Sequence, residues 1–282
     1  MGSGKIIAII GGDIRMAHAA ESLSQKHQTS LFAGKDFSGT LPKALYEADI
    51  VLLPFPYSDA TEEFLHTPLY DGKIPVHCLF AAAAEGSHIL GGRFGDKAKK
   101  LAAERNITLH DYQNDPEILS VGTVASAEGA VAMAMTACPD TIAGERCVVL
   151  GNGRCGSAIA ARLSAWDAEV TVISRGAVPG QRHCSFNDEA GVFLALSEAN
   201  IVFNTVPSPV LTAERLSKMK PGALVIDIAS NPGGTDFAAA AELGITAALA
   251  PGIPGKYAPR AAGRVLADCV QKFIETTKNK GV

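Results

Sequence analysis

Short apolar runs alternate with longer stretches of helical composition along almost the whole chain. Residues 16–27 and 96–106 have helix-forming side chains and polar faces, and each lies between two apolar runs. This alternation is typical of β-α-β units, in which helices cover a parallel sheet. Strands are predicted in the first half at 5–10, 28–33, 49–54, 76–81 and 107–112.

The same pattern starts again after a long stretch of small apolar residues. Residues 121–137 predict a connecting helix, because the stretch is uninterrupted until Cys138-Pro139. The end of the chain, 258–278, predicts another long helix, with Pro259 near its first turn. The predicted fold class is therefore α/β, with two Rossmann-like doubly wound parallel-sheet domains joined by a long helix. Strands of the second half are predicted at 147–151, 169–174, 200–206, 223–229 and 246–250.

Composition and charge narrow the classes of function. The 282-residue chain is 47% hydrophobic and 19% charged, which is enough apolar material for two cores. Its formal net charge is -4 and it has no basic run, so we expect neither nucleic acid nor a membrane surface as a partner. A small anionic substrate remains compatible with this balance, because a pocket needs only a few local cations.

The segments that usually direct a chain to a membrane are not expected here. From the sequence we expect no apolar stretch to approach the ~20 residues that span a bilayer, and the N-terminus runs into a predicted strand without a signal peptide. The 6 cysteines form no CxxC pair, and neither cysteine nor histidine spacing predicts a metal site. We therefore expect reduced thiols in a cytoplasmic protein.

The clearest motif is GNGRCG at 151–156, which has the GxGxxG spacing. A predicted strand precedes it and an amphipathic stretch follows, in which Ile159, Leu163 and Trp166 form an apolar stripe. In a dinucleotide-binding fold the first glycine permits a tight turn, and the second lets the pyrophosphate approach the backbone closely. The third lets the helix pack closely against the strand. A tight turn without a ligand is the alternative. The cofactor-binding residues predicted from this motif are Gly151, Gly153, Arg154, Cys155 and Gly156.

The end of the next strand bears on which dinucleotide is bound. An NAD-selective site usually has Asp or Glu there, which bonds the ribose 2′-hydroxyl. Here the strand runs into Ser174-Arg175. A hydroxyl and a guanidinium suit a 2′-phosphate, and no carboxylate is present to repel it. The predicted cofactor is therefore NADP, with a solvated loop arginine as the alternative role of Arg175.

Two later strand ends are expected at the same edge of the sheet. Asn204, Thr205 and Val206 precede a proline-stiffened turn, where they would contact the nicotinamide ribose unless the turn is an ordinary connection. Asp227, in the following strand, is included among the cofactor contacts.

Candidate substrate-binding residues lie in both halves. The Gly11-Gly12 turn lacks the dinucleotide spacing, but with Arg15 it would suit a carboxylate at a helix N-terminus. Ser126, early on the connecting helix, offers a hydroxyl, and Arg260 follows a Gly/Pro-rich loop as a further cation.

Two carboxylates are candidates for proton transfer. Glu128 lies on the connecting helix and has an exposed helix acid as its alternative role. Asp236 lies in a Gly-rich loop, and capping the following helix is its alternative role. His77 and Cys78 lie in an apolar run, where we expect core residues rather than ligands or nucleophiles.

Taken together, the motifs resemble the family of dipicolinate synthase A subunits. The similarity covers nearly the whole chain and is strongest from about residue 144 onward, while 55–95 match poorly. SAEG stands where a Thr-Val-Glu-Gly type of sequence is expected, so Ser126 would replace the threonine. More distantly, the second half resembles the nucleotide domains of D-2-hydroxyacid dehydrogenases and adenosylhomocysteine hydrolase. The motifs are GGDIR (11–15), PVHC (75–78), SAEG (126–129), GNGRCG (151–156), NTVP (204–207), ASNPGGTDF (229–237) and APGIPGKYAPRAAG (250–263).

The resemblance implies a specific reaction. A dihydrodipicolinate-type intermediate from the lysine pathway would be oxidised with NADP to dipicolinate (pyridine-2,6-dicarboxylate) in the cytoplasm of the mother cell of a sporulating bacterium. The implied partner is a flavoprotein-like B subunit, and we expect a homo-oligomer or hetero-oligomer. The alternatives are another NAD(P)-dependent 2-hydroxy- or keto-acid dehydrogenase and a nucleotide-binding subunit without catalytic activity.

The resulting domain organisation has four segments. We expect an N-terminal substrate or partner domain over 1–120, flavodoxin- or Rossmann-like, and a connecting helix over 121–143. An NADP-binding Rossmann domain is expected over 144–258. The C-terminal helix, 259–282, would pack back on the first domain.

Overall fold

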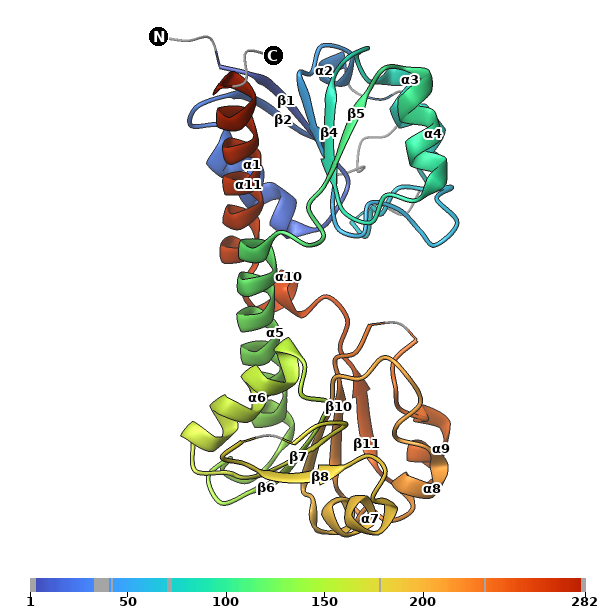
Figure 1. Ribbon diagram of the computed structural model, residues 1–282, viewed down its shortest axis with the longest axis vertical. Coiled ribbons are helices and arrows are strands. Elements are labelled where there is room, and N and C mark those ends of the chain that lie inside the picture. Colours follow the sequence, from blue (N-terminus) through green and yellow to red (C-terminus); the bar gives the residue numbers. More distant parts are fainter. Residues whose placement is uncertain are drawn as a thin grey trace. The chain divides into compact units, whose positions relative to one another are not determined.

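The chain folds into two compact units, and the first is built from both ends of the chain. Unit 1 comprises Met1–Val121 together with Pro259–Val282, and unit 2 comprises Gly122–Ala258 (Figure 1). This is a computed structural model, and it describes residues 4–32, 41, 43–69, 73–177, 179–230 and 232–279.

In the described part of unit 1, five parallel strands form a sheet in the order β2-β1-β3-β4-β5. This is a flavodoxin-like order, in which the direction of winding reverses between β1 and β3. The strands are β1 (Ile6–Ile10), β2 (Gln28–Phe32), β3 (Ile50–Leu52), β4 (His88–Gly91) and β5 (Thr108–Asp111). The helices are α1 (Ile14–Leu23), α2 (Lys43–Tyr46), α3 (Val76–Ala82), α4 (Asp96–Glu104) and α11 (Pro259–Asn279).

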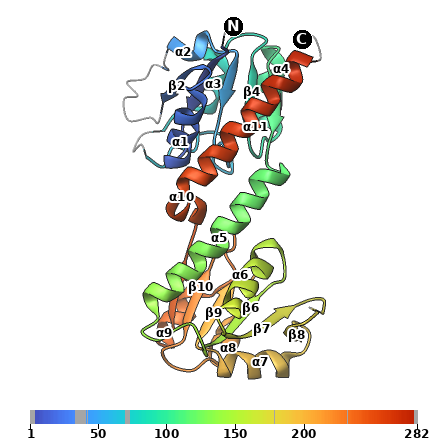
Figure 2. The ribbon, with the colours of Figure 1, turned by 90° about the vertical axis from the view of Figure 1, so that its left-hand side faces the viewer.

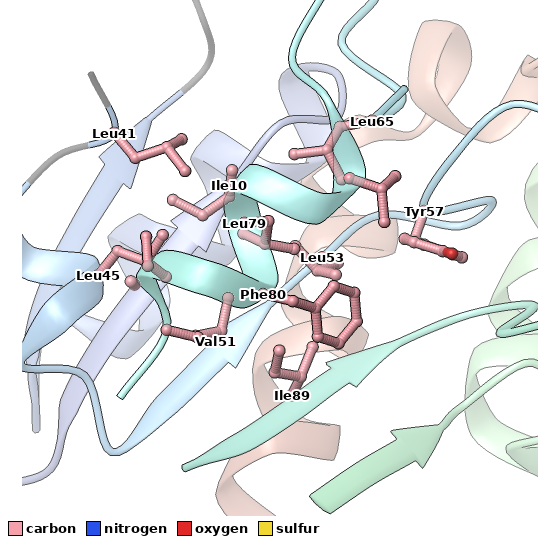
Figure 3. Packing of buried hydrophobic residues seen from close by; sticks show 14 of the residues in the cluster. Ile10, Leu41, Leu45, Val51, Leu53, Tyr57, Leu65, Leu79, Phe80 and Ile89 are labelled. Atoms are coloured by element: carbon pink, nitrogen blue, oxygen red, sulfur yellow. The ribbon is translucent and has the colours of Figure 1, made fainter. Parts of the chain in front are cut away.

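Helices cover both faces of this sheet. On one face, α2, α3 and α4 contribute to a core in which Val51, Leu79 and Phe80 are buried (Figure 3). On the other face, α1 and α11 lie side by side (Figure 2). A Cβ atom at Gly263 of α11 would lie 2.4 Å from the carbonyl oxygen of Arg15. The two helices therefore approach so closely that only glycine fits at their crossing.

In the described part of unit 2, a six-stranded parallel sheet has the order β11-β10-β9-β6-β7-β8. This is the order of dinucleotide-binding folds, with the reversal between β6 and β9. The strands are β6 (Arg146–Leu150), β7 (Glu169–Ser174), β8 (Arg182–Ser185), β9 (Ile201–Asn204), β10 (Leu224–Asp227) and β11 (Thr246–Leu249). The helices are α5 (Pro116–Ala137), most of which belongs to this unit, α6 (Arg154–Ala165), α7 (Glu189–Glu198), α8 (Ala213–Leu216), α9 (Phe237–Glu242) and α10 (Ile253–Tyr257).

The two sheets confirm the predicted fold class, but the fourth predicted strand is wrong. Residues 76–81 form helix α3, and the fourth strand is His88–Gly91. Val76, Leu79 and Phe80 are buried at the three- and four-residue spacing of a helix. A short apolar run does not distinguish a buried strand from a buried helix, which explains the error. Since the segment is helical, His77 is exposed rather than in the core.

Other elements differ in their ends or were not predicted. Strand β8 was missed because RHCS is polar and its residues are at least partly exposed. Trp166 does not complete the apolar stripe of α6, because it caps the helix C-terminus and is 48% exposed.

Helix α5 is longer than predicted, because it begins at Pro116. In the described residues it is the one helix long and apolar enough to cross a membrane by length and composition. The expectation that no stretch reaches this length was therefore wrong. A single such helix is weak evidence for a membrane-spanning segment. Two of its side chains also form ion pairs, Glu117 with Lys272 and Glu128 with Arg162.

A pair of histidines lies between the sheet of unit 1 and α11. His88 Nδ1 and His110 Nε2 are 3.2 Å apart, and both rings pack against Phe273. Burial lowers the pKa of both histidines. Lys5 lowers the pKa of His88 further, while Asp49 opposes this. The folded state therefore holds both rings neutral below the pH at which free histidine becomes charged.

We predict that unit 1 loses stability in mild acid. The unfolded chain takes up protons near pH ~6.5, whereas the folded chain resists them, so the free energy of unfolding should fall as pH drops below this value. Denaturant unfolding across this range should give a shallower pH dependence for His110→Phe, which keeps a ring against Phe273. Some dependence should remain, since burial also lowers the pKa of His66. His77→Gln is the control on an exposed histidine, and a wild-type slope in His110→Phe would contradict the assignment.

Candidate functional site

The glycine motif forms the turn between β6 and α6, and two of its glycines are required by the protein itself. Gly151 has a φ of 95°, in the region that favours glycine. A Cβ there would lie 2.6 Å from Oγ1 of Thr205. A Cβ at Gly156 would lie 2.1 Å from the carbonyl oxygen of Gly151. These contacts fix the close packing of α6 against the turn.

The middle glycine has no such requirement. Gly153 is the N-cap of α6 with a φ of -77°, a value open to any residue, and no described atom lies within 4 Å of an added Cβ. No side chain caps the helix, and its first turn has no acidic residue. The amides of the first helical turn and the helix dipole therefore remain open to an anion. The pyrophosphate of a dinucleotide suits this turn, because the space beside Gly153 is open and the amides of the first helical turn face it.

The end of β9 lies beside this turn, across the winding reversal. Thr205 donates from Oγ1 to the carbonyl oxygen of Leu150, at 2.8 Å, and so connects β9 to the end of β6. Asn204 is fully buried, and its side chain both donates to and accepts from the backbone of Val206. The side chains of Asn204 and Thr205 thus fix the backbone of this loop.

Asp227, at the end of β10, organises the following loop. Its carboxylate is fully buried and accepts hydrogen bonds from the amides of Ala229 and Gly234, each at 2.9 Å. It also accepts a bond from Oγ1 of Thr235 at 2.7 Å. A Cβ at Gly234 would lie 2.6 Å from Nδ2 of Asn204, so the β9 and β10 loops are packed together. Direct contact between Asp227 and a cofactor stays a prediction.

The end of β7 holds the residues predicted to select NADP. Ser174 is 5% exposed and donates from Oγ to the carbonyl oxygen of Gly176 at 2.7 Å. Its Oγ also lies 3.0 Å from Nε2 of His183, on the unpredicted strand β8. Arg175 is exposed and forms no ion pair with a described residue. Ser174 therefore shapes the turn, and the guanidinium of Arg175 has no ion-pair partner among the residues that the structure describes. His183 was missed because its strand has no apolar alternation.

The thiol of Cys155, in the first turn of α6, lies near the side chains of Thr123 and Ser126 on α5. Burial raises the pKa of Cys155, while Arg154 and these two hydroxyls lower it. The structure thus brings Ser126 to the glycine turn, within unit 2. Thr123 was not predicted, although its spacing to Ser126 on a helix would have suggested a shared face.

The candidate proton acceptors each have a structural partner. Glu128 pairs with Arg162 at 3.3 Å. Oδ1 of Asp236 accepts a hydrogen bond from the amide of Ala239 at 3.0 Å and caps α9, while Oδ2 has no hydrogen bond with a described residue. Neither contact tests a role in catalysis.

The two predicted substrate arginines belong to unit 1. Arg15 forms an ion pair with Asp13, in which its Nε lies 2.8 Å from Oδ1. Arg260 lies exposed in the first turn of α11 and pairs with no described carboxylate. The remaining predicted residues, from Ser126 to Asp236, belong to unit 2.

We predict that alanine at one position of the turn lowers mainly the stability of the protein, and that alanine at another lowers mainly its affinity for NADPH. Gly156→Ala should lower the free energy of unfolding by about 2–3 kcal/mol, because its Cβ meets the backbone of Gly151. Gly153→Ala should cost about 1 kcal/mol or less. It should nevertheless raise the dissociation constant for NADPH about tenfold or more, since its Cβ occupies the space next to the pyrophosphate. Denaturant unfolding and fluorescence titration measure the two effects. Unchanged NADPH affinity in Gly153→Ala would show that this space is not used.

Two families match successive parts of the chain. The N-terminal domain of dipicolinate synthase A subunits matches residues 6–113. The D-isomer specific 2-hydroxyacid dehydrogenase, NAD binding domain, matches residues 124–232, which include the glycine turn. Unit 2 is therefore a dehydrogenase-type domain for a nicotinamide dinucleotide.

Whole-chain comparisons extend over both units. The dipicolinate synthase A subunit of Bacillus subtilis (strain 168) is 29% identical over 96% of this chain and 96% of its own length. The crystal structure of the corresponding A subunit from Bacillus halodurans is 28% identical, with a TM-score of 0.81 over 97% of this chain and 98% of its own. A transhydrogenase from Sinorhizobium meliloti, 17% identical with a TM-score of 0.67 over 96% of this chain and 94% of its own, shares the fold alone. Over nearly its whole length, the chain is thus similar to dipicolinate synthase A subunits.

Proposed function

We propose that this protein is an NADP-dependent oxidoreductase that converts a dihydrodipicolinate-type intermediate to dipicolinate. The observation that carries the proposal is the similarity to dipicolinate synthase A subunits over nearly the whole chain. The geometry of unit 2 supports it, since the open N-terminus of α6 at Gly153 suits a dinucleotide pyrophosphate.

NADP rather than NAD is proposed on the chemistry at the end of β7. Ser174 holds the turn by its bond to Gly176, and the exposed guanidinium of Arg175 has no carboxylate partner among the described residues. A free, planar, always charged group suits the dianionic 2′-phosphate. The Asp or Glu that would bond a ribose 2′-hydroxyl and repel this phosphate is not at this strand end.

The residues of the chain would mainly position the substrate and fix its charges. NADP, when bound, supplies the hydride acceptor. The two substrate carboxylates call for cations, for which Arg15 and Arg260 are proposed, with Arg154 for either a carboxylate or the pyrophosphate. Ser126 would offer its hydroxyl to the substrate from beside Cys155. Because ring aromatisation favours the reaction, the proton acceptor need not be strongly basic.

Glu128 and Asp236 remain the proposed proton acceptors. Oδ2 of Asp236 is available, since the cap of α9 uses Oδ1. Oε1 of Glu128 lies 3.3 Å from Nη2 of Arg162, so this carboxylate is positioned by an ion pair. Asp236→Asn retains a good helix N-cap while removing the charge, so it separates the two roles of this side chain.

We predict that Arg175→Ala raises the Michaelis constant for NADP about tenfold or more while changing that for NAD little, because only NADP loses a charged partner. Steady-state kinetics with both cofactors measure the ratio. Lys220→Ala, at an exposed cation before β10, is the control. Equal changes in the Michaelis constants for NADP and NAD in Arg175→Ala would contradict the assignment of Arg175 to the 2′-phosphate.

The reaction itself is tested by incubating the purified chain with a dihydrodipicolinate precursor and NADP, with and without a candidate B subunit. Absorbance of the pyridine product without the partner is the expected result and supports catalysis by this chain. Product only with the partner would favour a nucleotide-binding subunit without catalytic activity. Turnover with 2-hydroxy acids instead would favour a dehydrogenase of that class.

The proposal extends to the cellular setting. A B subunit is the proposed partner, because the relatives are named as A subunits. We place the reaction in the cytoplasm of the mother cell during sporulation, by the same similarity.

A further inference from the structure

A second cluster of polar side chains lies at the winding reversal of the sheet in unit 1. The turn after β1 carries Gly11 and Gly12, and the loop after β3 returns to it at His66. The amide of Gly12 donates to the carbonyl oxygen of His66 at 2.8 Å, and the amide of His66 donates to the carbonyl oxygen of Tyr57 at 2.9 Å. The backbone of His66 is thus fixed beside the beginning of α1, where open α/β sheets bind ligands.

The guanidinium of Arg15 is oriented at this place. Its Nε donates to both carboxylate oxygens of Asp13, at 2.8 and 3.0 Å, and its backbone amide donates to Oδ1 at 3.0 Å. The side chain of Arg15 is 19% exposed. Its two terminal amino groups form no hydrogen bond with a described residue. The guanidinium is therefore held in place, and the edge that binds a carboxylate in bidentate fashion has no partner in the described part of the chain.

His66 supplies a second unused donor. It is half-buried, and neither ring nitrogen hydrogen bonds with a residue in the described part of the chain. Burial lowers the pKa of His66, Arg15 lowers it further, and Asp13 opposes both. The lowered pKa favours the neutral imidazole, which donates one N–H without adding charge. A bound carboxylate would favour the charged ring and so cause proton uptake.

The cluster suits an anion better than a cation. Both oxygens of Asp13 are occupied by Arg15, so the groups left without partners are the terminal amino groups of Arg15 and the ring of His66. An N-cap ion pair by itself would account for Asp13 and Arg15 but would leave the half-buried ring of His66 without a partner.

We propose that Arg15 and His66 form a carboxylate-binding subsite of unit 1, which takes one carboxylate of a small dicarboxylic acid. The choice of acid rests on the proposed function, whereas the subsite rests on the geometry of these two residues. His66, which no sequence motif indicated, is a specificity residue in this arrangement because it contributes the donor that Arg15 lacks on its own.

The test is calorimetric titration of the full chain with pyridine-2,6-dicarboxylate near pH ~6 and pH ~8, in two buffers of different ionisation enthalpy. The wild-type chain should bind more tightly at the lower pH, with proton uptake. Arg15→Gln should raise the dissociation constant about tenfold or more. His66→Gln should raise it less and should abolish the proton uptake. His77→Gln is the matched control, because His77 lies exposed on α3.

Folding of unit 1 in each variant is checked by denaturant unfolding, in which the transition should match that of the wild-type chain. Diacid binding that is weakened in Arg15→Gln and, to a lesser extent, in His66→Gln supports the subsite even if the chain oxidises no dihydrodipicolinate. Wild-type affinity and proton uptake in His66→Gln, or no diacid binding by the wild-type chain, would overturn the subsite even if the oxidation succeeds. The two proposals therefore fail separately.

Discussion

The contact between Gly156 and the carbonyl oxygen of Gly151 determines the geometry of the nucleotide unit. It lets α6 begin directly over the end of β6, because a Cβ at Gly156 would stand only 2.1 Å from that oxygen. The N-terminus of the helix then opens at Gly153, where no described atom fills the space of a side chain. Thr205 ties β9 to the same turn, so the winding reversal is rigid on both sides.

Several polar side chains at the strand ends stabilise loops rather than present their own atoms. Asn204, Asp227 and Ser174 are each nearly or fully buried, and each bonds the backbone of the loop that follows it. Burial of these groups requires such partners, since an unpaired buried carboxylate or amide is costly. Among the described residues, the groups near this turn without such partners are the backbone amides at the start of α6 and the exposed guanidinium of Arg175.

Unit 1 uses a comparable arrangement with different chemistry. Asp13 caps α1 and at the same time orients Arg15, so one carboxylate both stabilises the helix and fixes a cation. Helix α11 packs beside α1 at Gly263, and both helices bury apolar side chains against the same face of the sheet.

Local pattern in the sequence determined the strand–turn–helix of the glycine motif and the α/β class, because each depends on residues close together in the chain. It did not distinguish helix from strand at Val76–Ala82, since a short apolar run fits either until its neighbours are known. Only the tertiary structure decided which polar groups are consumed by their own loops, as in Asp227. It also placed His66 beside Gly12 through a backbone bond between distant segments, which no local pattern records.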